Sequence, residues 1–417
     1  MRTDLDKLME KAGVDALWVS GNLFDNPDMV YLSGIHHVNQ ADLFKKKGSD
    51  PVLFHQVDME REEAAKSGLH CEVYFSETPL EEYIQQAGGD VAGAIAIRIK
   101  EAMQSHAITS GTVAISGQVN LAPYHAIFAH LKSLQPDITF TSFYKDSPFL
   151  TARMTKDLGE VAHIRQMGEI TTDVIARVQT FLQSCQLKNE QLLREDGEAL
   201  TVADVKSRIN LWLAEAGADN PEETIFAIGR DGGIPHSAGN PTDPITLGKP
   251  IVFDIFPCES GGGYFYDCTR TWCLGYAPEA VLDLYRQVLD IHHRLIENLK
   301  PGTPFKHYQD MACDLFSHHG HTTIAENRTT RSGYLHSIGH GVGLDVHEKP
   351  FSGLTAAADD ILTPGVVFTI EPGLYYPERG MGVRIEDTIY LNQQGQFEVL
   401  ADYPYDLVIP IGKKYDT

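Results

Sequence analysis

Two aspartates lie inside apolar, β-branched runs that are typical of neighbouring strands. The run Ile251-Val-Phe-Asp254-Ile-Phe256 is followed, after three consecutive glycines, by Tyr264-Phe-Tyr-Asp267-Cys-Thr-Arg-Thr271. The glycines supply a turn or a bulge, so the segment is predicted to be a β-hairpin whose carboxylates face each other. Removing a carboxylate from water is costly unless it is paired, hydrogen-bonded or bound to a cation. Two together call for positive charge, although this segment alone fits exposed aspartates on a sheet edge equally well.

Three histidines fall within a short glycine-rich segment, His336-Ser-Ile-Gly-His340-Gly-Val-Gly-Leu-Asp-Val-His347. Glycine admits close backbone approach, and imidazole is both a borderline metal ligand and a proton donor near neutral pH. Any one of the three alone would usually be an ordinary core or surface histidine. The cluster favours a site that binds a metal and moves protons.

Two glutamates occupy comparable positions further along the chain. Glu371 follows the apolar run 366–370 and precedes Pro372-Gly373, which predicts a carboxylate at the end of a buried strand beside a turn. Glu386 lies within the β-branched run 383–390. A solvated alternating strand face would explain Glu386 if it stood alone.

The chain has 417 residues, more than one hydrophobic core usually organises, so about two or three domains are expected. In its first part, short apolar runs alternate with helical patterns, which predicts an α/β domain over residues 1–150. The expected strands are 16–19, 52–55, 71–75 and 113–116, and the expected helices are 4–12, 58–67, 91–105 and 121–133.

Residues 151–417 have an α+β pattern. A capping box at Thr201 and Asp204 predicts a helix start there. The acidic stretch 188–200 is expected to be an exposed loop. Further helices are expected at 155–185, 278–299 and 305–319, and strands at 223–228, 251–257, 264–273, 366–371 and 383–391.

The charge and cysteine content narrow the function classes. A formal charge of −23, from 57 acidic against 34 basic residues, repels phosphate backbones and makes nucleic acid an unexpected partner. The chain shows no stretch near the roughly 20 apolar residues of a membrane span, so a cytoplasmic protein without membrane contact is expected. Its six cysteines form no Cys-x-x-Cys pair, which predicts reduced, mostly buried thiols. Cys268 beside Asp267 is a conceivable extra ligand, but packing is the favoured interpretation.

Taken in order, the acidic and histidine positions resemble the five-ligand pattern of the pita-bread metallopeptidases, which include methionine aminopeptidase, aminopeptidase P and prolidase. The motifs that carry this resemblance are His336-Ser-Ile-Gly-His340-Gly-Val-Gly, Glu371-Pro-Gly, Arg384-Ile-Glu386-Asp and Arg153-x-x-Lys156-x-x-x-Glu160. They span residues 150–410; the N-terminal part is similar only in size and α/β pattern to the extra domain of prolidase, aminopeptidase P and creatinase. The resemblance implies a creatinase/prolidase-like α/β N-terminal domain followed by an α+β pita-bread catalytic domain.

One departure concerns the hairpin. Twelve residues separate Asp254 from Asp267, two more than is usual in the family, and Phe256-Pro257 replaces a common glycine. Two extra residues preserve the alternation of side chains, so the ligand assignment stands. The tip is expected to be reshaped, with consequences for specificity if it borders the cleft.

The resemblance implies two divalent ions, and four carboxylates with one imidazole suit Mn, Co, Zn or Fe. Such a pair acidifies a bridging water, polarises an amide carbonyl and stabilises the oxyanion. By resemblance, Asp254 and Asp267 bind one ion, Asp267 and His340 the second, and Glu371 and Glu386 both. Glu371 is the candidate base.

The remaining site candidates are assigned by their matching positions. His236 and His347 are expected to be non-ligands that contact substrate, where an imidazole donates to the carbonyl oxygen or the departing nitrogen. His336 is either an outer partner of the ligands or structural. Arg384 is expected to orient a metal carboxylate, with a surface ion pair as the alternative.

The implied function is release of an N-terminal residue before proline, either from longer peptides or from dipeptides. The extra domain is the reason for preferring proline. The alternatives are a metal-dependent hydrolase of another small amide or ester and a non-catalytic binding module, which retention of all five ligands disfavours. Creatinase shares the architecture but works without this metal set. A homodimer is also implied.

Overall fold

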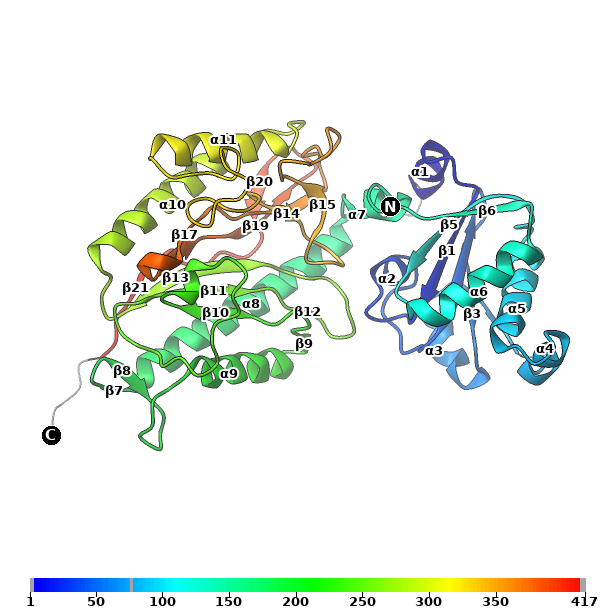
Figure 1. Cartoon of the computed structure of the whole chain (residues 1–417), viewed down its shortest axis with the longest axis horizontal. Coiled ribbons are helices and arrows are strands. Elements are labelled where there is room, and N and C mark those ends of the chain that lie inside the picture. Colours follow the sequence, from blue (N-terminus) through cyan, green and yellow to red (C-terminus); the bar gives the residue numbers. More distant parts are fainter. Residues whose placement is uncertain (1–3, 76–77, 413–417) are drawn as a thin grey trace. The chain divides into compact units, whose positions relative to one another are not determined.

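The computed structural model describes residues 4–75 and 78–412. The chain divides into two compact units, one of Met1–Arg153 with Gly261–Gly263 and the other of Met154–Ser260 with Tyr264–Thr417. Figure 1 traces both. The sequence-based division at residue 150 falls inside helix α7 (Pro148–Arg153) and stays a prediction for the domain boundary.

The first unit contains a mixed six-stranded sheet in the order β4-β3-β2-β1-β5-β6. Strand β2 runs antiparallel to both β1 and β3, whereas the other neighbours are parallel. The strands are β1 (Ala16–Gly21), β2 (Ala41–Lys46), β3 (Val52–His55), β4 (His70–Val73), β5 (Gly111–Gly117) and β6 (Ile138–Thr141). The helices are α1 (Leu5–Lys11), α2 (Pro27–Ser33), η2 (Asp58–Glu60), α3 (Arg61–Ala65), α4 (Leu80–Gln86), α5 (Val91–Ser105), α6 (Leu121–Leu134) and α7.

Each expected strand and helix of the first unit is present, but the sequence analysis missed β2, β6, α2, α4 and α7. The reason is clearest for β2, where Asp42, Lys45 and Lys46 obscure the apolar pattern. Asp42 is nevertheless buried, because Trp18 and Ser20 donate hydrogen bonds to it from β1. A tertiary contact therefore decides the environment of a polar strand residue.

The second unit is built on two larger sheets. The first has the order β10 (Ile225–Ile228), β11 (Pro250–Ile255), β13 (Cys268–Leu274), β21 (Val408–Ile409). The second has the order β15 (Glu348–Phe351), β14 (His340–Gly341), β16 (Val367–Ile370), β19 (Asp387–Leu391), β20 (Phe397–Val399). Three two-stranded sheets add β7 (Gln186–Lys188) with β8 (Gln191–Leu193), β9 (Ala218–Asp219) with β12 (Cys258–Glu259), and β17 (Gly373–Tyr376) with β18 (Met381–Arg384).

Two helix pairs cover these sheets. Helices α8 (Leu158–Ser184) and α9 (Val202–Glu215) share a hydrophobic core with the four-stranded sheet. Helices α10 (Glu279–Glu297) and α11 (Lys306–His318) share another core with the five-stranded sheet. Figure 1 shows the two pairs on opposite sides of the unit, with the strands between them. The short helices η3 (Asp231–Gly233) and η4 (Pro377–Arg379) complete the unit.

The predicted capping box of α9 is confirmed: the Asp204 backbone donates to the Thr201 side chain, and the Asp204 carboxylate accepts from the Thr201 backbone. Two other expectations were wrong. Residues 383–391 form two strands, β18 and β19, with Glu386 between them. Residues 188–200 are not simply an exposed loop, because β8 pairs with β7 and Leu192 and Leu200 are buried in the core beneath α8 and α9.

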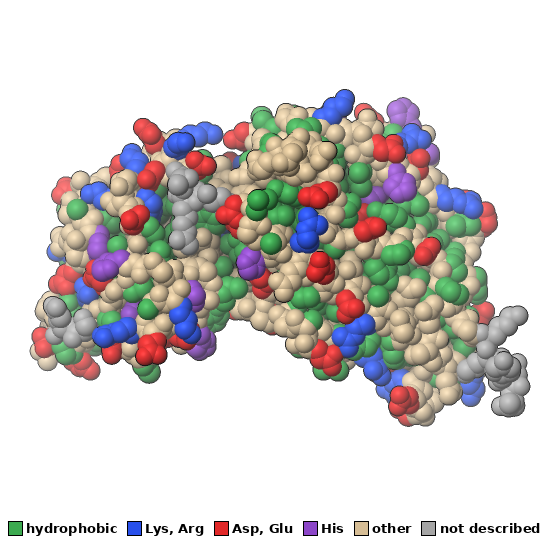
Figure 2. All heavy atoms as spheres, turned by 180° about the vertical axis from the view of Figure 1, so that it is seen from behind, with side chains coloured by type: hydrophobic (Ala, Val, Ile, Leu, Met, Phe, Trp, Pro, Cys, Tyr) green, Lys and Arg blue, Asp and Glu red, His purple; other side chains and the backbone are tan. Residues whose placement is uncertain are grey.

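The surface carries charges of both signs. The face in Figure 2 shows acidic and basic side chains interspersed, in a chain whose acids outnumber its bases. Within residues 4–75 and 78–412, none of the helices combines the length and apolarity that a bilayer span needs.

Candidate active site

A cavity of about 480 Å³ in the second unit collects the nine residues that were predicted from the sequence to form the site. Its lining comes from both large sheets and from the loops that follow their strands. The nine predicted site residues in the lining are His236, Asp254, Asp267, His336, His340, His347, Glu371, Arg384 and Glu386. The roles assigned to these side chains stay predictions, but their convergence gives them one shared environment.

The two aspartates enter from the antiparallel pair β11 and β13. Asp254 pairs with Thr269 across the strands, and Asp267 lies two residues before Thr269, so all three share one face of the sheet. Asp254 is 7% exposed and Asp267 is 4% exposed, which rules out the exposed-edge alternative. The connection is longer than a tight turn, since it includes β12, and Gly261 and Gly262 adopt φ values of 89° and 79° that favour glycine.

His340 lies on β14, where its glycine neighbours allow close backbone packing. A Cβ added to Gly341 would lie 2.0 Å from the Lys349 carbonyl oxygen. The His340 Nδ1–H donates to the Gly341 carbonyl at 3.1 Å. The Nε2 lone pair therefore faces the acids, 3.7 Å from Asp267 Oδ2 and 3.6 Å from Glu371 Oε1. This tautomer is the one that a metal-binding imidazole needs.

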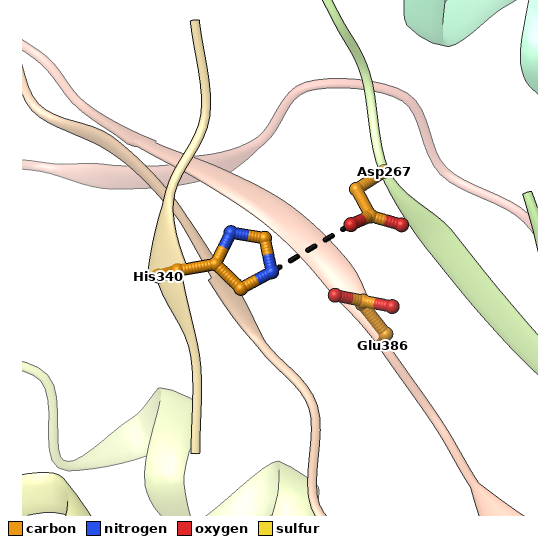
Figure 3. A group of neighbouring side chains, drawn as sticks. All are labelled: Asp267, His340 and Glu386. Carbon is orange, nitrogen blue, oxygen red and sulfur yellow. Dashed lines mark ion pairs between the residues drawn. The ribbon is translucent and has the colours of Figure 1, made fainter. Parts of the chain in front are cut away.

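Asp267, His340 and Glu386 form the tightest group, with one ligand atom from each lying within 4.8 Å of the others. Figure 3 shows the three side chains pointing toward one another, His340 from β14, Asp267 from the residue before β13 and Glu386 from the residue before β19. Burial and neighbouring carboxylates raise the pKa of Asp267 well above its ordinary value and that of Glu386 to about 8. Asp254 Oδ1, Asp267 Oδ1 and Glu386 Oε1 are buried without a hydrogen-bond partner in the described chain. A divalent cation fits this donor set, because it offsets both the desolvation and the mutual repulsion.

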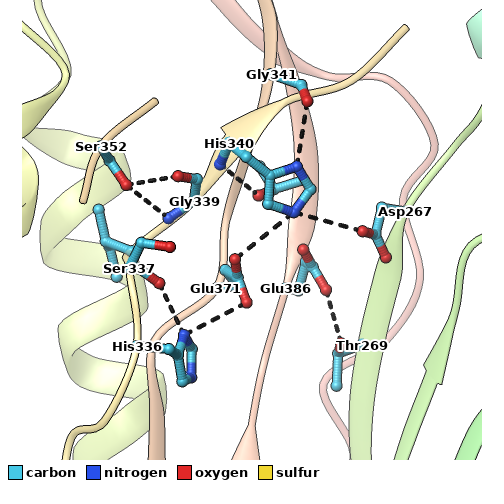
Figure 4. Close-up of polar contacts among 12 residues, drawn as sticks. Asp267, Thr269, His336, Ser337, Gly339, His340, Gly341, Ser352, Glu371 and Glu386 are labelled. Carbon is cyan, nitrogen blue, oxygen red and sulfur yellow. Dashed lines mark hydrogen bonds and ion pairs between the residues drawn. The ribbon is translucent and has the colours of Figure 1, made fainter. Parts of the chain in front are cut away.

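Glu371 follows β16 directly, as expected, and lies between two histidines (Figure 4). Its Oε2 is 3.6 Å from His336 Nδ1, while its Oε1 faces His340. Burial and the charge of Glu386 raise the pKa of Glu371 well above its ordinary value. Its backbone N–H donates to the Ile338 carbonyl at 2.8 Å, which ties β16 to the histidine segment.

His336 is fully engaged by the protein. Its Nδ1–H donates to the Ser337 carbonyl at 2.7 Å, and its Nε2 accepts from the Tyr375 hydroxyl at 2.8 Å. Burial lowers the pKa of His336 to about 3, so the ring is neutral. These contacts favour the outer, supporting role among the two roles that the sequence left open.

Arg384, at the end of β18, links the two-stranded sheet of β17 and β18 to the four-stranded sheet. Its Nη2 donates to Asp254 Oδ2 at 2.5 Å, its Nη1 to the Tyr375 hydroxyl at 2.8 Å, and its Nε to Thr269 Oγ1 at 3.1 Å. The Thr269 hydroxyl in turn donates to Glu386 Oε2 at 2.7 Å. Arg384 therefore orients Asp254 directly and Glu386 through Thr269. The sequence analysis missed Thr269 and Tyr375; the period-two spacing of Thr269 from Asp267 was the signal for the first.

His347 lies beside His340, with ring centroids 4.2 Å apart and the ring planes tilted by 53°. Burial lowers the pKa of His347, whereas the negative charges of Glu222 and Asp254 oppose that shift. His236 reaches the same cavity from the loop after η3. Both imidazoles are therefore placed beside the acid cluster.

Apolar and acidic side chains complete the lining, among them Ile225, Phe256 and Phe351, and Glu222 and Glu223. Phe256 marks the departure noted in the hairpin and does border the cavity. Cys268 packs in the core behind the site, where its thiol lies 3.6 Å from the Glu386 carbonyl oxygen, in agreement with the packing interpretation. All six cysteines are free thiols.

Proteins of known name share this fold and part of this sequence. The chain is 28% identical over 259 residues to the Xaa-Pro dipeptidase of Pyrococcus furiosus, covering 59% of this chain and 70% of that protein. Its fold is similar to a dipeptidase from Pyrococcus horikoshii, with a TM-score of 0.74, 23% identity, and 98% and 99% of the two chains covered. It is also similar to the X-Pro aminopeptidase from Thermotoga maritima, with a TM-score of 0.72, 22% identity, and 97% and 100% covered.

These similarities confirm the expected fold class, an α/β N-terminal unit followed by a pita-bread unit. The family model for metallopeptidase family M24 matches residues 162–393, more than half of the chain and all of the segment from Asp254 to Glu386. The name of that family implies use of a divalent metal, which the acid and imidazole cluster fits. This chain belongs to metallopeptidase family M24.

Proposed function

We propose that this chain hydrolyses the peptide bond between an N-terminal residue and proline, using two divalent ions. The observation that carries the proposal is one cavity that gathers five candidate ligands and three further histidines around carboxylate oxygens that are buried without a partner in the described chain. The relatives' names, Xaa-Pro dipeptidase and X-Pro aminopeptidase, support the choice of bond. The five proposed ligands are Asp254, Asp267, His340, Glu371 and Glu386.

When bound, two ions of Mn, Co, Zn or Fe supply an acidified water and polarise the scissile carbonyl. The protein's own groups do the rest. The Glu371 carboxylate, fixed at the end of β16, takes the proton of the attacking water. His236 and His347 donate hydrogen bonds to the carbonyl oxygen and to the departing nitrogen. Arg384 holds Asp254 in one orientation throughout.

The lining also suits proline. Ile225, Phe256 and Phe351 offer apolar surface against which a pyrrolidine ring packs without losing a hydrogen bond. Proline contributes no backbone N–H at the scissile bond, so the cavity needs no acceptor for one. The departing nitrogen needs a proton instead, which the two histidines are placed to supply.

The deciding experiment uses metal-stripped protein resupplied with Mn(II), Co(II) or Zn(II), and follows hydrolysis of Ala-Pro-Ala, Ala-Pro-amide and Met-Ala-Ser. We expect metal-dependent cleavage before proline, absent from a folded Asp267→Asn variant. Circular dichroism of that variant separates loss of chemistry from loss of fold. A folded protein that binds two ions per chain and leaves every proline peptide intact would overturn the proposal.

That result would favour the second candidate function, which is hydrolysis of another small amide or ester in the same cavity. This second function would use the same metal chemistry, but the apolar lining would bind a group other than proline. A panel of acyl amides and esters, assayed with the same metal-loaded protein, would test it. The binding-module alternative stays disfavoured, because all five ligand candidates are present. The expectations of a homodimer and a cytoplasmic location stay predictions.

A further inference from the structure

The charged groups that line the cavity are strongly unbalanced. Its acids are Glu222, Glu223, Asp254, Asp267, Glu371 and Glu386. Among the described lining residues, Arg384 is the one permanently charged base. Two divalent ions would offset the four ligand carboxylates, and Lys206 pairs with Glu223, so Glu222 is the rim charge that the described lining does not offset.

Arg384 has little to offer a ligand. A guanidinium carries five N–H groups. Four of them are used, by Asp254, Thr269, Tyr375 and the Pro235 carbonyl. The residue is only 3% exposed. Its charge is therefore committed to positioning the site.

The rim glutamates lie on the segment before β10, where both are exposed to solvent and still line the cavity. The Glu223 carboxylate accepts a hydrogen bond from Lys206 Nζ at 3.0 Å, so that lysine is already paired. Glu222 lines the same cavity as His236 and His347. The rim therefore adds negative charge to a cavity whose interior is already acidic.

This arrangement discriminates between the two kinds of proline substrate. In a dipeptide, the free carboxylate sits on the proline Cα, next to the departing nitrogen, and so must enter the cavity. A buried carboxylate without a cation or donors is costly, and like charges nearby add to the cost. In a longer peptide, that position is a neutral amide, and the terminal charge moves outward by roughly 3.5 Å per residue.

We propose that this cavity selects peptides of three or more residues over dipeptides, because its described lining provides no free cation for a carboxylate on proline and carries the acidic Glu222 at its rim. The inference rests on the proposed cleavage before proline and names its substrate class. It makes the chain an aminopeptidase of longer peptides, unlike the dipeptidases that it resembles in sequence.

The test compares Ala-Pro with Ala-Pro-amide, which differ only in the charge on proline. With metal-loaded protein, we expect kcat/KM for the amide to exceed that for the acid by about tenfold or more. Ala-Pro-Ala should resemble the amide. Calorimetric titration with the two uncleavable analogues, in which CH₂–N replaces CO–N, should show the same preference in Kd and thereby separate binding from chemistry.

Rim variants sharpen the comparison. Glu222→Gln should shrink the amide-to-acid ratio severalfold, and Glu222→Lys should shrink it further by supplying a cation. Glu297→Gln on α10 makes the same change in net charge at an exposed position outside the cavity lining, so its ratio should match that of the unmodified protein.

Two failures are distinguishable. Equal cleavage of acid and amide, or a preference for the acid, overturns the length selection while leaving the proline peptidase intact. Cleavage of neither by folded, metal-loaded protein overturns the proposed function itself. A ratio that persists in Glu222→Lys overturns the role assigned to the rim.

Discussion

Buried carboxylates occur in both units, and their surroundings differ in kind. In the first unit, Asp42 accepts hydrogen bonds from Trp18, Ser20 and Tyr74, so both of its oxygens are satisfied by the protein. In the second unit, Asp254, Asp267 and Glu386 each keep a buried oxygen without a partner in the described chain. The hydrogen bonds of Asp42 stabilise the first unit. The second arrangement leaves oxygen atoms that can bind a cation.

The largest expected effect comes from removing one of those ligand atoms. Asp267→Asn should lower kcat/KM by about 10³-fold, equivalent to about 4 kcal/mol, because the amide is a poor substitute for a metal carboxylate. Metal analysis should show loss of bound ion. The metal-stripped variant should unfold no more easily than the metal-stripped parent, since a repelled carboxylate has been neutralised. Equal metal content and activity would contradict the ligand assignment.

The matching change in the first unit should behave in the opposite way. Asp42→Ala leaves Trp18 and Tyr74 without their acceptor, whereas Ser20 keeps a hydrogen bond to Tyr124. At about 1–3 kcal/mol for each buried unsatisfied group, the free energy of unfolding should fall by several kcal/mol. Bound metal per folded chain should be unchanged. Urea denaturation and metal analysis on the same sample measure both. A loss of bound metal without a loss of stability would contradict the structural role assigned to Asp42.

A smaller effect is expected from the residue that positions the ligands. Arg384→Lys keeps the charge but cannot bond Asp254, Thr269 and Tyr375 together, because an ammonium lacks the planar fork of a guanidinium. Metal affinity should fall by about 10- to 100-fold, the usual cost of altering an outer partner. Competition against a chelating dye measures it. Unchanged affinity would reduce Arg384 to a packing role.

The smallest expected effect is a pH dependence confined to the metal-stripped protein. Glu386 has a folded pKa of about 8 against an ordinary value of 4.5, and the pKa values of Asp267 and Glu371 are also raised. The buried histidines, whose lowered pKa values act in the opposite direction, have an ordinary pKa of 6.5, so their effect is complete above that pH. Between about pH 6.5 and 8 the folded state therefore binds more protons than the unfolded state, and stability falls as pH rises across that window. Thermal melts should show Tm decreasing across this window. Saturating Mn(II) should flatten the decrease, and a metal-stripped Tm that rises with pH would contradict it.

Most of the candidate site was predictable, because its side chains lie in strongly patterned segments. Asp254 interrupts an apolar strand, Glu371 ends one, and His340 lies among glycines that leave no room for Cβ atoms. A charged or close-packed residue at such a position is unfavourable unless it has a binding partner. The positions can therefore be recognised in the sequence alone. Thr269 and Tyr375 were missed because hydroxyl groups are common in strands, and their importance comes only from partners distant in sequence.

The fold was less fully predictable where local pattern and tertiary contact disagree. The sequence of β2 has a polar pattern, but in the structure Trp18 and Tyr74 donate hydrogen bonds to its Asp42. The sequence of β8 is typical of a loop, but its Leu192 is buried in the core that α8 and α9 share. The separation of β18 from β19 at Glu386 was likewise invisible in a continuous β-branched run. In each case, a partner from elsewhere in the chain changes the environment that the local pattern suggests.

By itself, the sequence determined the α/β unit followed by an α+β unit, because hydrophobic periodicity acts locally along the chain. It also carried the ordered motifs whose resemblance to the pita-bread metallopeptidases implies the candidate ligands. Only the tertiary structure decided that Arg384 bonds Asp254, that His336 is held by Tyr375, and that Glu222 and Glu223 line a cavity whose described residues include Arg384 as the one permanently charged base. Hydrogen bonds and charge balance depend on distances in space, and those are set only when segments distant in the sequence come together.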